Sequence, residues 1–390
     1  MANMHDDVVV PFAQGTARFL TLSGVRNLDA WKRAFQEKCK DQRFYELIEE
    51  TLANDFEYHY ALLQDGSGNI RGIQPIFFVR QNLVEGMRGT FRRIVDLIRK
   101  KFPRFLTMRV LMVGCAAGAG ELGASNPKDE QFVAEALSAT LRTYARESRA
   151  SLVVLKDFPA RYRRTLAVLS DDGYARVPSM PMTRLALSFQ NFDEYLQTLG
   201  YVSRKSLRRK FRKTERDAKI DMEVVNDITP NIDAIYPLYL QVHKRSPMKF
   251  ETLTKEFFCR IAEIMRERAR FFIWRQSDKI VAFSLCLVCD DTVYDECLGL
   301  DYDVALDLHL YFYTMRDVIR WAIEQQLRHY CSGPLNYDPK LHLGHELAPL
   351  DLYVLHTRAL LNPIFRLAVK YLEPTRHDPI LRKFPNADQV

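Results

Sequence analysis

The chain has 390 residues, of which 47% are hydrophobic, 27% charged and 12% aromatic. This content of apolar and aromatic side chains is enough to form buried cores, which excludes an intrinsically disordered protein and a collagen-like or low-complexity fibre. The length exceeds that of one ordinary domain and predicts two, of roughly 150 to 200 residues each.

The net charge of +7 is concentrated in one segment. Residues 203–213 carry seven cations and no acid, so the positive and negative charges of the rest of the chain balance. The seven are Arg204, Lys205, Arg208, Arg209, Lys210, Arg212 and Lys213. The sequence therefore predicts one basic helix rather than a surface that attracts polyanions everywhere.

The seven cysteines are odd in number and scattered among apolar neighbours, which is typical of reduced thiols. The first residues include Asp6 and Asp7, where a secretory signal would carry cations. The longest apolar run, residues 280–289, is too short to cross a bilayer. We therefore expect a soluble cytoplasmic protein without a membrane span.

In the first half of the chain, apolar residues repeat with the periods of strands and helices, and turn residues separate these stretches. This pattern predicts a hairpin followed by alternating helices and strands. In chain order these are strands at 56–63 and 71–79, a helix at 84–101, a strand at 105–113, a helix at 129–148, a strand at 152–155, a helix at 161–170 and a strand at 183–189.

The second half begins with a predicted helix that Asn191 caps and Glu194 supports, and that leads into the basic segment. A strand, two helices, a second hairpin region and a long helix follow. Their predicted ranges are 221–225, 232–244, 253–266, 270–298 with its turns, and 308–326, before a strand at 329–331 and a final segment at 350–372.

Each half is expected to form a mainly antiparallel sheet backed by helices, so the predicted fold class is α/β (α+β) with one arrangement present twice. The hairpin regions at 56–79 and 270–298 are the basis of this repeat, since the halves share an order of elements and not identities. We place the boundary near Pro178 and Pro181, giving lobes of residues 1–184 and 185–390.

Four segments of the second half, in this order, resemble GNAT acyltransferases and in particular FemAB-like proteins. A helix with an acidic start passes into an Arg/Lys-rich one within 193–215, and a short turn enters an apolar strand at 279–285. A leucine–histidine pair, Leu308 and His309, begins a long helix, and a Lys/Gly/Pro stretch at 337–349 closes the domain.

This resemblance is closest over residues 185–375 and implies tandem GNAT-like domains with mixed, mostly antiparallel sheets flanked by helices. The implied activity is transfer of an acyl group from an acyl thioester, with acyl-CoA as cosubstrate, to an amine of a small molecule or peptide. A Fem-type transferase that uses aminoacyl-tRNA and a catalytically silent GNAT-like binding module are the alternatives. The oligomeric state stays open.

Acyl transfer requires a neutral amine, a positioned carbonyl and stabilisation of the oxyanion. In GNAT-like folds a backbone N–H group at a splayed strand usually stabilises the oxyanion. Glu296 and Asp301, on and after one strand, are the candidate general bases, and Tyr311 or Tyr313 is the candidate proton donor by resemblance. His309 is a candidate for orienting the site. The alternative is that these are paired strand carboxylates, core-edge tyrosines and a structural histidine.

For donor binding, the resemblance points to Lys340 and the nearby Tyr337 in the closing stretch. The basic helix offers Arg204, Arg208, Arg209 and Lys210, whose i, i+4 neighbours leave Leu207 and Phe211 as a narrow apolar seam. Such a helix fits tRNA phosphates, a phosphorylated donor or an anionic surface. Its alternative is a solvated face paired with acids elsewhere.

One segment departs from the GNAT pattern. Enzymes of this fold that hold coenzyme A usually have a glycine-rich loop between strand and helix, which cradles the pyrophosphate. The corresponding residues 301–309 contain no glycine and three acids, Asp301, Asp303 and Asp307. This argues against coenzyme A bound in the usual manner.

Three further patterns carry little weight. Residues 110–120 resemble a methyltransferase glycine loop, but the nearest acid that could serve such a site is Asp157, too far along the chain. Cys286 and Cys289 have zinc-knuckle spacing inside an apolar strand, and the residues 342–345 form no second ligand pair. We expect no metal.

Overall fold

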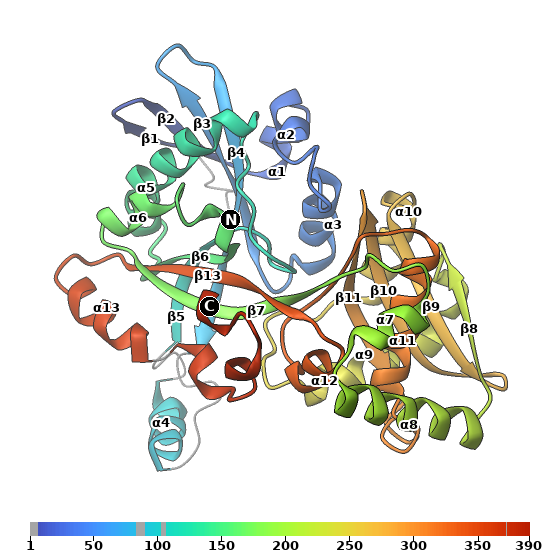
Figure 1. Cartoon of the computed structure of the whole chain (residues 1–390). Helices are drawn as coiled ribbons and strands as arrows, with labels where there is room; N and C mark the ends of the chain where they lie inside the picture. The colour runs from blue at the N-terminus through green and yellow to red at the C-terminus, as the bar shows by residue number, and fades with distance from the viewer. Residues whose placement is uncertain (1–6, 83–89, 103–106, 372) are drawn as a thin grey trace. The chain divides into compact units, whose positions relative to one another are not determined.

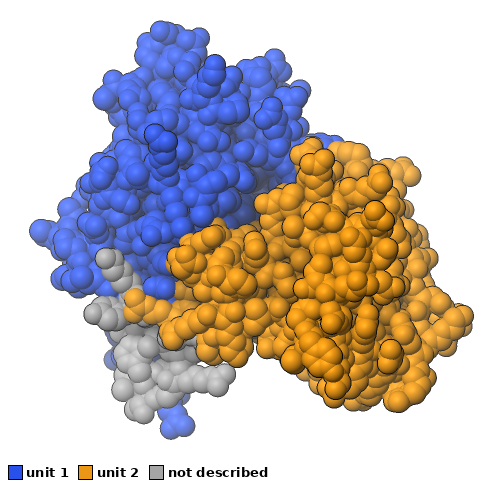
Figure 2. Space-filling view, viewed as in Figure 1, with its two compact units in different colours: residues 1–179, 350–374 blue, residues 180–349, 375–390 orange. Residues whose placement is uncertain are grey.

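A computed structural model describes residues 7–82, 90–102, 107–371 and 373–390 (Figure 1). The chain divides into two compact units, coloured in Figure 2. Unit 1 comprises residues 1–179 and 350–374, and unit 2 comprises residues 180–349 and 375–390. Residues 350–374, which the sequence-based division assigned to the second lobe, therefore belong to unit 1.

Unit 1 contains a sheet in the order β1-β2-β3-β4-β5-β6-β13. Neighbouring strands are antiparallel except β5 and β6, which are parallel, with Val110 opposite Leu152 and Val113 opposite Leu155. The strands are β1 (Val8–Phe12), β2 (Gly15–Leu20), β3 (Glu57–Asp65), β4 (Ile70–Asn82), β5 (Thr107–Val113), β6 (Leu152–Pro159) and β13 (Glu346–His356).

The long helix of unit 1 packs its apolar stripe against this sheet. In α5 (Glu130–Glu147), Val133, Leu137, Leu141 and Tyr144 recur at helical spacing and are buried, and the Tyr144 ring stacks on Phe19 with ring centroids 3.6 Å apart. The other helices are α1 (Leu22–Val25), α2 (Asp29–Ala34), α3 (Gln42–Leu52), α4 (Thr90–Lys101), α6 (Ala167–Asp171) and α13 (Asn362–Tyr371).

Unit 2 contains strands in the order β7-β12-β11-β10-β9-β8. Here the parallel pair is β11 and β12, and the remaining pairs are antiparallel. The strands are β7 (Ala175–Ala186), which begins in unit 1, β8 (Ile220–Val225), β9 (Ala269–Gln276), β10 (Lys279–Cys289), β11 (Thr292–Leu300) and β12 (His329–Ser332).

Two helices cover one face of this sheet. The apolar stripe of α11 (Leu310–Glu324) and the seam of Leu207 and Phe211 in α8 (Tyr201–Asp217) share one hydrophobic core with Phe272 and Trp274 of β9. The other helices are α7 (Phe192–Thr198), α9 (Ile232–Arg245), α10 (Lys255–Ile264) and α12 (Tyr337–His342). Short 3-10 helices lie at Pro127–Asp129, Ala160–Tyr162, Thr229–Asn231, Pro374–His377, Leu381–Lys383 and Ala387–Gln389.

The structure confirms the predicted fold class of mixed sheets flanked by helices. The Asn191 cap is also confirmed, since its side chain accepts a hydrogen bond from the Glu194 N–H over 2.9 Å. One local prediction was wrong: the helix expected at 161–170 is a 3-10 turn followed by the short α6. The two units divide between Ser179 and Met180, in the region of Pro178 and Pro181 where we place the boundary. This region lies inside β7, and β12 pairs only with Thr183–Ala186, so the missing proline N–H groups cost no bond to β12.

Candidate active site

The parallel pair of unit 2 ends where β11 is irregular. The ladder between β11 and β12 runs from Thr292 opposite His329 to Asp295 opposite Ser332, whereas β11 continues to Leu300. On its other edge, the register with β10 shifts after Asp295, so Glu296 is the extra residue of a bulge. Beyond Asp295, one edge of β11 is therefore no longer paired with β12.

A half-buried carboxylate lies at this point. Asp295 accepts a hydrogen bond from the Tyr330 hydroxyl, 2.6 Å from its Oδ2, and a second one from the Ser284 hydroxyl. Burial raises the pKa of the Asp295 carboxyl, while these hydrogen bonds and the charge of Lys340 oppose that rise. Asp295 is thus a carboxylate held in place by two hydroxyl donors.

Lys340, on α12, is 1% exposed. Its Nζ donates to the carbonyl oxygens of Gly333 and Leu335, the latter over 2.8 Å. Burial lowers the pKa of Lys340 to about 7, and the charge of Asp295 acts in the opposite direction. Near neutral pH an appreciable fraction of this amine is uncharged, with two N–H groups used by carbonyls and a lone pair remaining.

Tyr311, at the start of α11, is close enough to Asp295 for the two groups to influence each other's charge. Burial, followed by the charge of Asp295, raises the pKa of the Tyr311 hydroxyl, and a hydrogen bond with Asn336 opposes this rise. Tyr311 therefore stays protonated at neutral pH. We refer to Ser284, Asp295, Tyr311, Tyr330 and Lys340 as the Asp295 cluster.

Burial also determines the protonation state of His345, which lies beside this cluster. Its Nδ1 lies 3.1 Å from the Thr183 hydroxyl, and its ring meets Tyr330 edge to face with centroids 5.4 Å apart. Burial, reinforced by the charge of Lys340, lowers the pKa of His345 to about 3. His345 is therefore neutral, and its Nε2 is buried without a hydrogen-bond partner among the described residues.

Tyr311 and Lys340 are thus the predicted residues that the structure brings together. Glu296 occupies the adjacent bulge and is half-buried. The sequence argument named Glu296, which shares a predicted strand face with Tyr294, and did not consider Asp295. Asp295 instead lies opposite Cys286 and shares a face with Ser284 and Tyr330.

Other predicted residues make contacts outside the cluster. The buried Asp301 pairs with Lys279, with 2.6 Å between Nζ and Oδ2, and accepts a bond from the Asp303 N–H. The Arg316 guanidinium lies over the Tyr313 ring at 3.7 Å from its centroid. The Tyr337 hydroxyl donates to the Pro181 carbonyl over 2.8 Å, which makes Tyr337 a core residue of α12.

Helix α8 presents its cations to solvent. Arg208, Arg209 and Arg212 are exposed and form no ion pair with any residue that the structure describes. Arg204 instead donates to the carbonyls of Gln197 and Leu199, and so closes the end of α7. A groove along the exposed face is lined by Tyr201, Arg204, Lys205, Arg208, Arg209, Arg212, Lys213 and Arg216.

The basic helix reaches the acidic loop 301–309. Lys213 donates to the Asp307 carbonyl over 2.6 Å, and Thr214 donates to the Leu308 carbonyl over 2.6 Å. His309 begins α11 in a left-handed conformation, with φ of 48°. Partial burial, followed by the charges of Lys213 and Lys210 in α8, lowers the pKa of His309. Lys210 itself lies 4.3 Å from the ring centroid of Phe312, and partial burial lowers its pKa.

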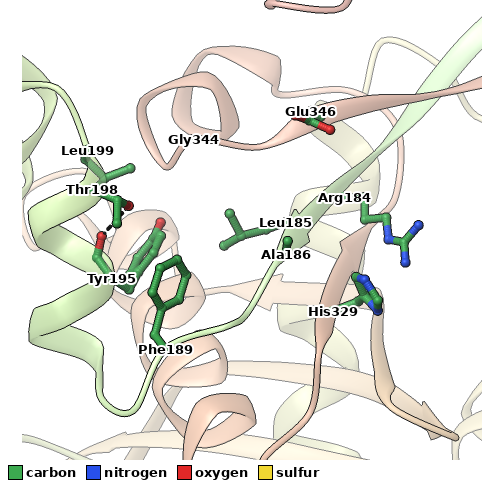
Figure 3. Close-up of a pocket in the computed structure, with 10 residues that line it drawn as sticks. All are labelled: Arg184, Leu185, Ala186, Phe189, Tyr195, Thr198, Leu199, His329, Gly344 and Glu346. Atoms are coloured by element: carbon green, nitrogen blue, oxygen red, sulfur yellow. Dashed lines mark hydrogen bonds between the residues drawn. The ribbon is translucent and has the colours of Figure 1, made fainter.

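A hollow of about 360 Å³ lies elsewhere in unit 2 (Figure 3). Tyr195, Phe189 and Leu185 contribute apolar surface, and Arg184, His329 and Glu346 contribute polar groups. His329 begins β12, whereas the Asp295 cluster lies where the ladder of β12 ends. The hollow contains none of the predicted catalytic residues.

The structure also bears on metal ions and membrane spans. Within the described ranges, histidine, cysteine, aspartate and glutamate side chains form no group of three that could hold a metal ion. A search of the same residues finds no helix with the length and apolar content needed to cross a membrane.

Comparison with known proteins identifies the family. The family model for FemAB-like proteins, described as peptidoglycan biosynthesis/recognition, matches residues 110–377. The chain belongs to the FemAB-like family. This assignment confirms the FemAB-like resemblance of the sequence analysis and, with it, the expected acyltransferase. A comparison with curated protein sequences gives no significant match.

Solved structures with this fold have little sequence identity to this FemAB-like protein. FemX is 11% identical with a TM-score of 0.51, covering 87% of this chain and 97% of its own. A tandem GNAT protein from the clavulanic acid biosynthesis pathway is 11% identical with a TM-score of 0.50, covering 88% and 99%. The C-terminal domain of a putative lysylphosphatidylglycerol synthetase from Agrobacterium fabrum is 14% identical with a TM-score of 0.49, covering 90% and 96%.

Proposed function

We propose that this FemAB-like protein transfers an aminoacyl group from aminoacyl-tRNA to an amine of a peptide substrate, with the reaction at the Asp295 cluster of unit 2. The cluster is the observation that carries the proposal, because it combines a buried amine whose pKa is about 7 with a protonated tyrosine. The family description, peptidoglycan biosynthesis/recognition, supports a peptide acceptor.

In the proposed reaction, the neutral Lys340 amine acts as general base. The acceptor nitrogen attacks the acyl carbonyl carbon, a C–N bond forms and Lys340 takes the proton that the nitrogen loses. The ester C–O bond then breaks, and Tyr311 supplies a proton to the leaving oxygen. Backbone N–H groups on the edge of β11 beyond Asp295 are the proposed oxyanion donors, in line with the GNAT resemblance.

Asp295 has an electrostatic role in this proposal. Its negative charge keeps the pKa of the Lys340 amine from falling further. Ser284 and Tyr330 in turn fix the carboxylate. Because these partners come from β10 and β12, the arrangement depends on the sheet and not on a loop.

Helix α8 supports the choice of aminoacyl-tRNA as the donor. Its exposed cations from Lys205 to Arg216 extend over roughly 16 Å at 1.5 Å per residue, which suits a row of nucleic-acid phosphates better than one pyrophosphate. The glycine-free acidic loop 301–309 is also unfavourable for a pyrophosphate. An acyl thioester of the acyl-CoA type is the second candidate, favoured by the same cations if only a few of them bind phosphate.

Transfer assays with matched donors test this proposal. The purified protein is incubated with a peptide amine and either labelled aminoacyl-tRNA or a panel of acyl-CoAs. The proposal predicts labelled peptide from aminoacyl-tRNA, abolished by ribonuclease. Free thiol and acylated peptide from an acyl-CoA alone would select the second donor. No transfer from either donor would contradict both and favour a binding module.

The cellular compartment is part of the same proposal. Aminoacyl-tRNA and acyl-CoA are cytoplasmic donors, and buried thiols such as those of Cys286 and Cys331 suit a reducing compartment. We therefore propose a cytoplasmic location, to be tested by cell fractionation.

A further inference from the structure

Exposed apolar side chains gather at one helix of unit 1. Twelve large apolar residues are exposed in the part of the chain that the structure describes, and four of them lie between residues 360 and 367. They are Leu360 at 91% exposure, Leu361 at 43%, Ile364 at 68% and Leu367 at 66%. This density is unusual for a surface that only water covers.

Helix α13 is held to its unit by the opposite side. Asn362, 6% exposed, accepts a bond from the His356 N–H and donates to the Gly173 carbonyl, each over 2.9 Å. The Phe365 ring packs on His356 with centroids 5.8 Å apart. At 100° per residue, Ile364 and Leu367 point away from Asn362 and Phe365. The apolar face is therefore directed outward by a fixed inner face.

The segment that carries this face has basic residues and no acidic ones. From residue 352 to residue 372 the sequence contains no aspartate or glutamate, and it contains Arg358, Arg366 and Lys370. Arg358 and Arg366 are exposed and form no ion pair with described residues. An outward apolar stripe on a segment with cations and without acids of its own is the pattern of a helix that lies in the interface of an anionic membrane.

We propose that the outer face of α13 binds the surface of an anionic lipid bilayer, with Leu360, Ile364 and Leu367 entering the headgroup region. Helix α4 of the same unit has a similar character, with Leu97 and Phe102 exposed and three cations in its last turn. Charge complementarity distinguishes a lipid surface from a second copy of the chain, whose α13 would bring like charges together. The proposal does not depend on the proposed reaction.

Cosedimentation of the full chain with vesicles tests it. The wild type is expected to bind vesicles that contain phosphatidylglycerol and to bind pure phosphatidylcholine more weakly. Ile364→Ser with Leu367→Ser is expected to weaken binding about tenfold or more, since two apolar side chains no longer enter the bilayer. Arg358→Gln with Arg366→Gln is expected to remove the preference for the anionic lipid. Circular dichroism checks that each variant is folded.

Controls separate this face from other surfaces. Met248→Ser with Leu306→Ser removes two exposed apolar side chains of unit 2 and is expected to leave binding unchanged. When Arg208, Arg209 and Arg212 are replaced by glutamine, the α13 variants are still expected to weaken vesicle binding. In an I364W variant, the fluorescence emission of the introduced tryptophan is expected to shift to shorter wavelength when anionic vesicles are added.

Three outcomes would overturn the proposal. They are the absence of binding to anionic vesicles, binding that the α13 variants do not change, and binding that only the α8 variant abolishes. Sedimentation velocity adds a fourth: a wild-type dimer that the Ile364→Ser, Leu367→Ser variant converts to monomer would assign the face to self-association.

Discussion

The two units end their parallel strand pairs in different ways. In unit 1 the loop after β5 contains Gly114, Gly118 and Gly120, and its carbonyl groups accept bonds from lysine, as Lys156 donates to Gly118 over 3.2 Å. In unit 2 the loop after β11 carries three aspartates, and the strand holds the half-buried Asp295 near Lys340. The order of strand, helix and parallel strand is the same in both.

This difference shows that the repeat conserves a backbone arrangement and not a chemistry. In unit 1 the lysine beside the strand end, Lys156, pairs with the adjacent Asp157 at 2.7 Å. In unit 2 the corresponding charges are separated into a buried amine with a lowered pKa and a carboxylate bound by hydroxyl groups. A general base at neutral pH requires the second arrangement. We therefore propose that catalysis takes place in unit 2.

The largest expected effect comes from removing the buried amine. Lys340→Met is expected to lower kcat by roughly 10² to 10⁴-fold, the usual contribution of a general base. Lys156→Met, the matched change in unit 1, is expected to keep a rate close to that of the wild type. Steady-state transfer assays, with thermal unfolding of both variants to check folding, make this comparison. Equal losses in the two variants would break the distinction between the units.

The second effect is on stability and follows from the lowered pKa of Lys340. An unfolded lysine binds its proton up to about pH 10.4, whereas the folded one loses it near pH 7. Between these values the unfolded state binds more protons, so stability rises with pH. From about pH 7 to about pH 9.5, the wild type should gain on the order of 3 kcal/mol over Lys340→Met in urea unfolding.

In this second experiment Lys156→Met is again the matched control. Since Lys156 pairs with Asp157, its variant should follow the pH dependence of the wild type. A Lys340→Met variant whose stability changes in parallel with the wild type would mean that the buried amine keeps an ordinary pKa.

The third effect concerns the donor. Replacement of Arg208, Arg209 and Arg212 by glutamine is expected to raise the KM for the donor about tenfold at low salt and to reduce the slope of log KM against log salt by roughly 2 to 3. Lys128→Gln with Arg146→Gln, exposed cations of unit 1, is the matched control. An unchanged salt slope would mean that the cations of α8 are only solvated and do not bind the donor.

The smallest effect is local. Asn191→Ala removes the side-chain cap of α7 and is expected to lower the free energy of unfolding by about 1 kcal/mol. Transfer activity should be unchanged, because the cap is distant in sequence from the Asp295 cluster and bonds only to the first turn of its helix. A loss of activity equal to that of Lys340→Met would show that α7 positions the site.

Local signals made much of the fold predictable. The hairpin of β3 and β4 and the cap at Asn191 depend on residues close in sequence, as does the basic helix. The sequence did not predict that residues 350–374 belong to unit 1. The apolar pattern of β13 predicts a strand, but it does not show that this strand pairs with β6.

The site was predictable only in part, for the same reason. Lys340 and Tyr311 came from the family resemblance. Asp295 was missed because strand alternation gives two faces and does not say which one meets Tyr330, 35 residues later in the chain. A search for carboxylates opposite small polar residues, here Ser284 and Cys286 in the neighbouring strand, could have found it.

Photo-crosslinking tests the assignment of donor and reaction to unit 2 most directly. The protein is irradiated with aminoacyl-tRNA or acyl-CoA that carries a photoreactive acyl group, and the crosslinked peptides are identified by mass spectrometry. We predict acyl crosslinks within residues 333–343 and, for the tRNA body, within 201–217. Acyl crosslinks confined to residues 107–124, at the glycine loop of unit 1, would contradict the account.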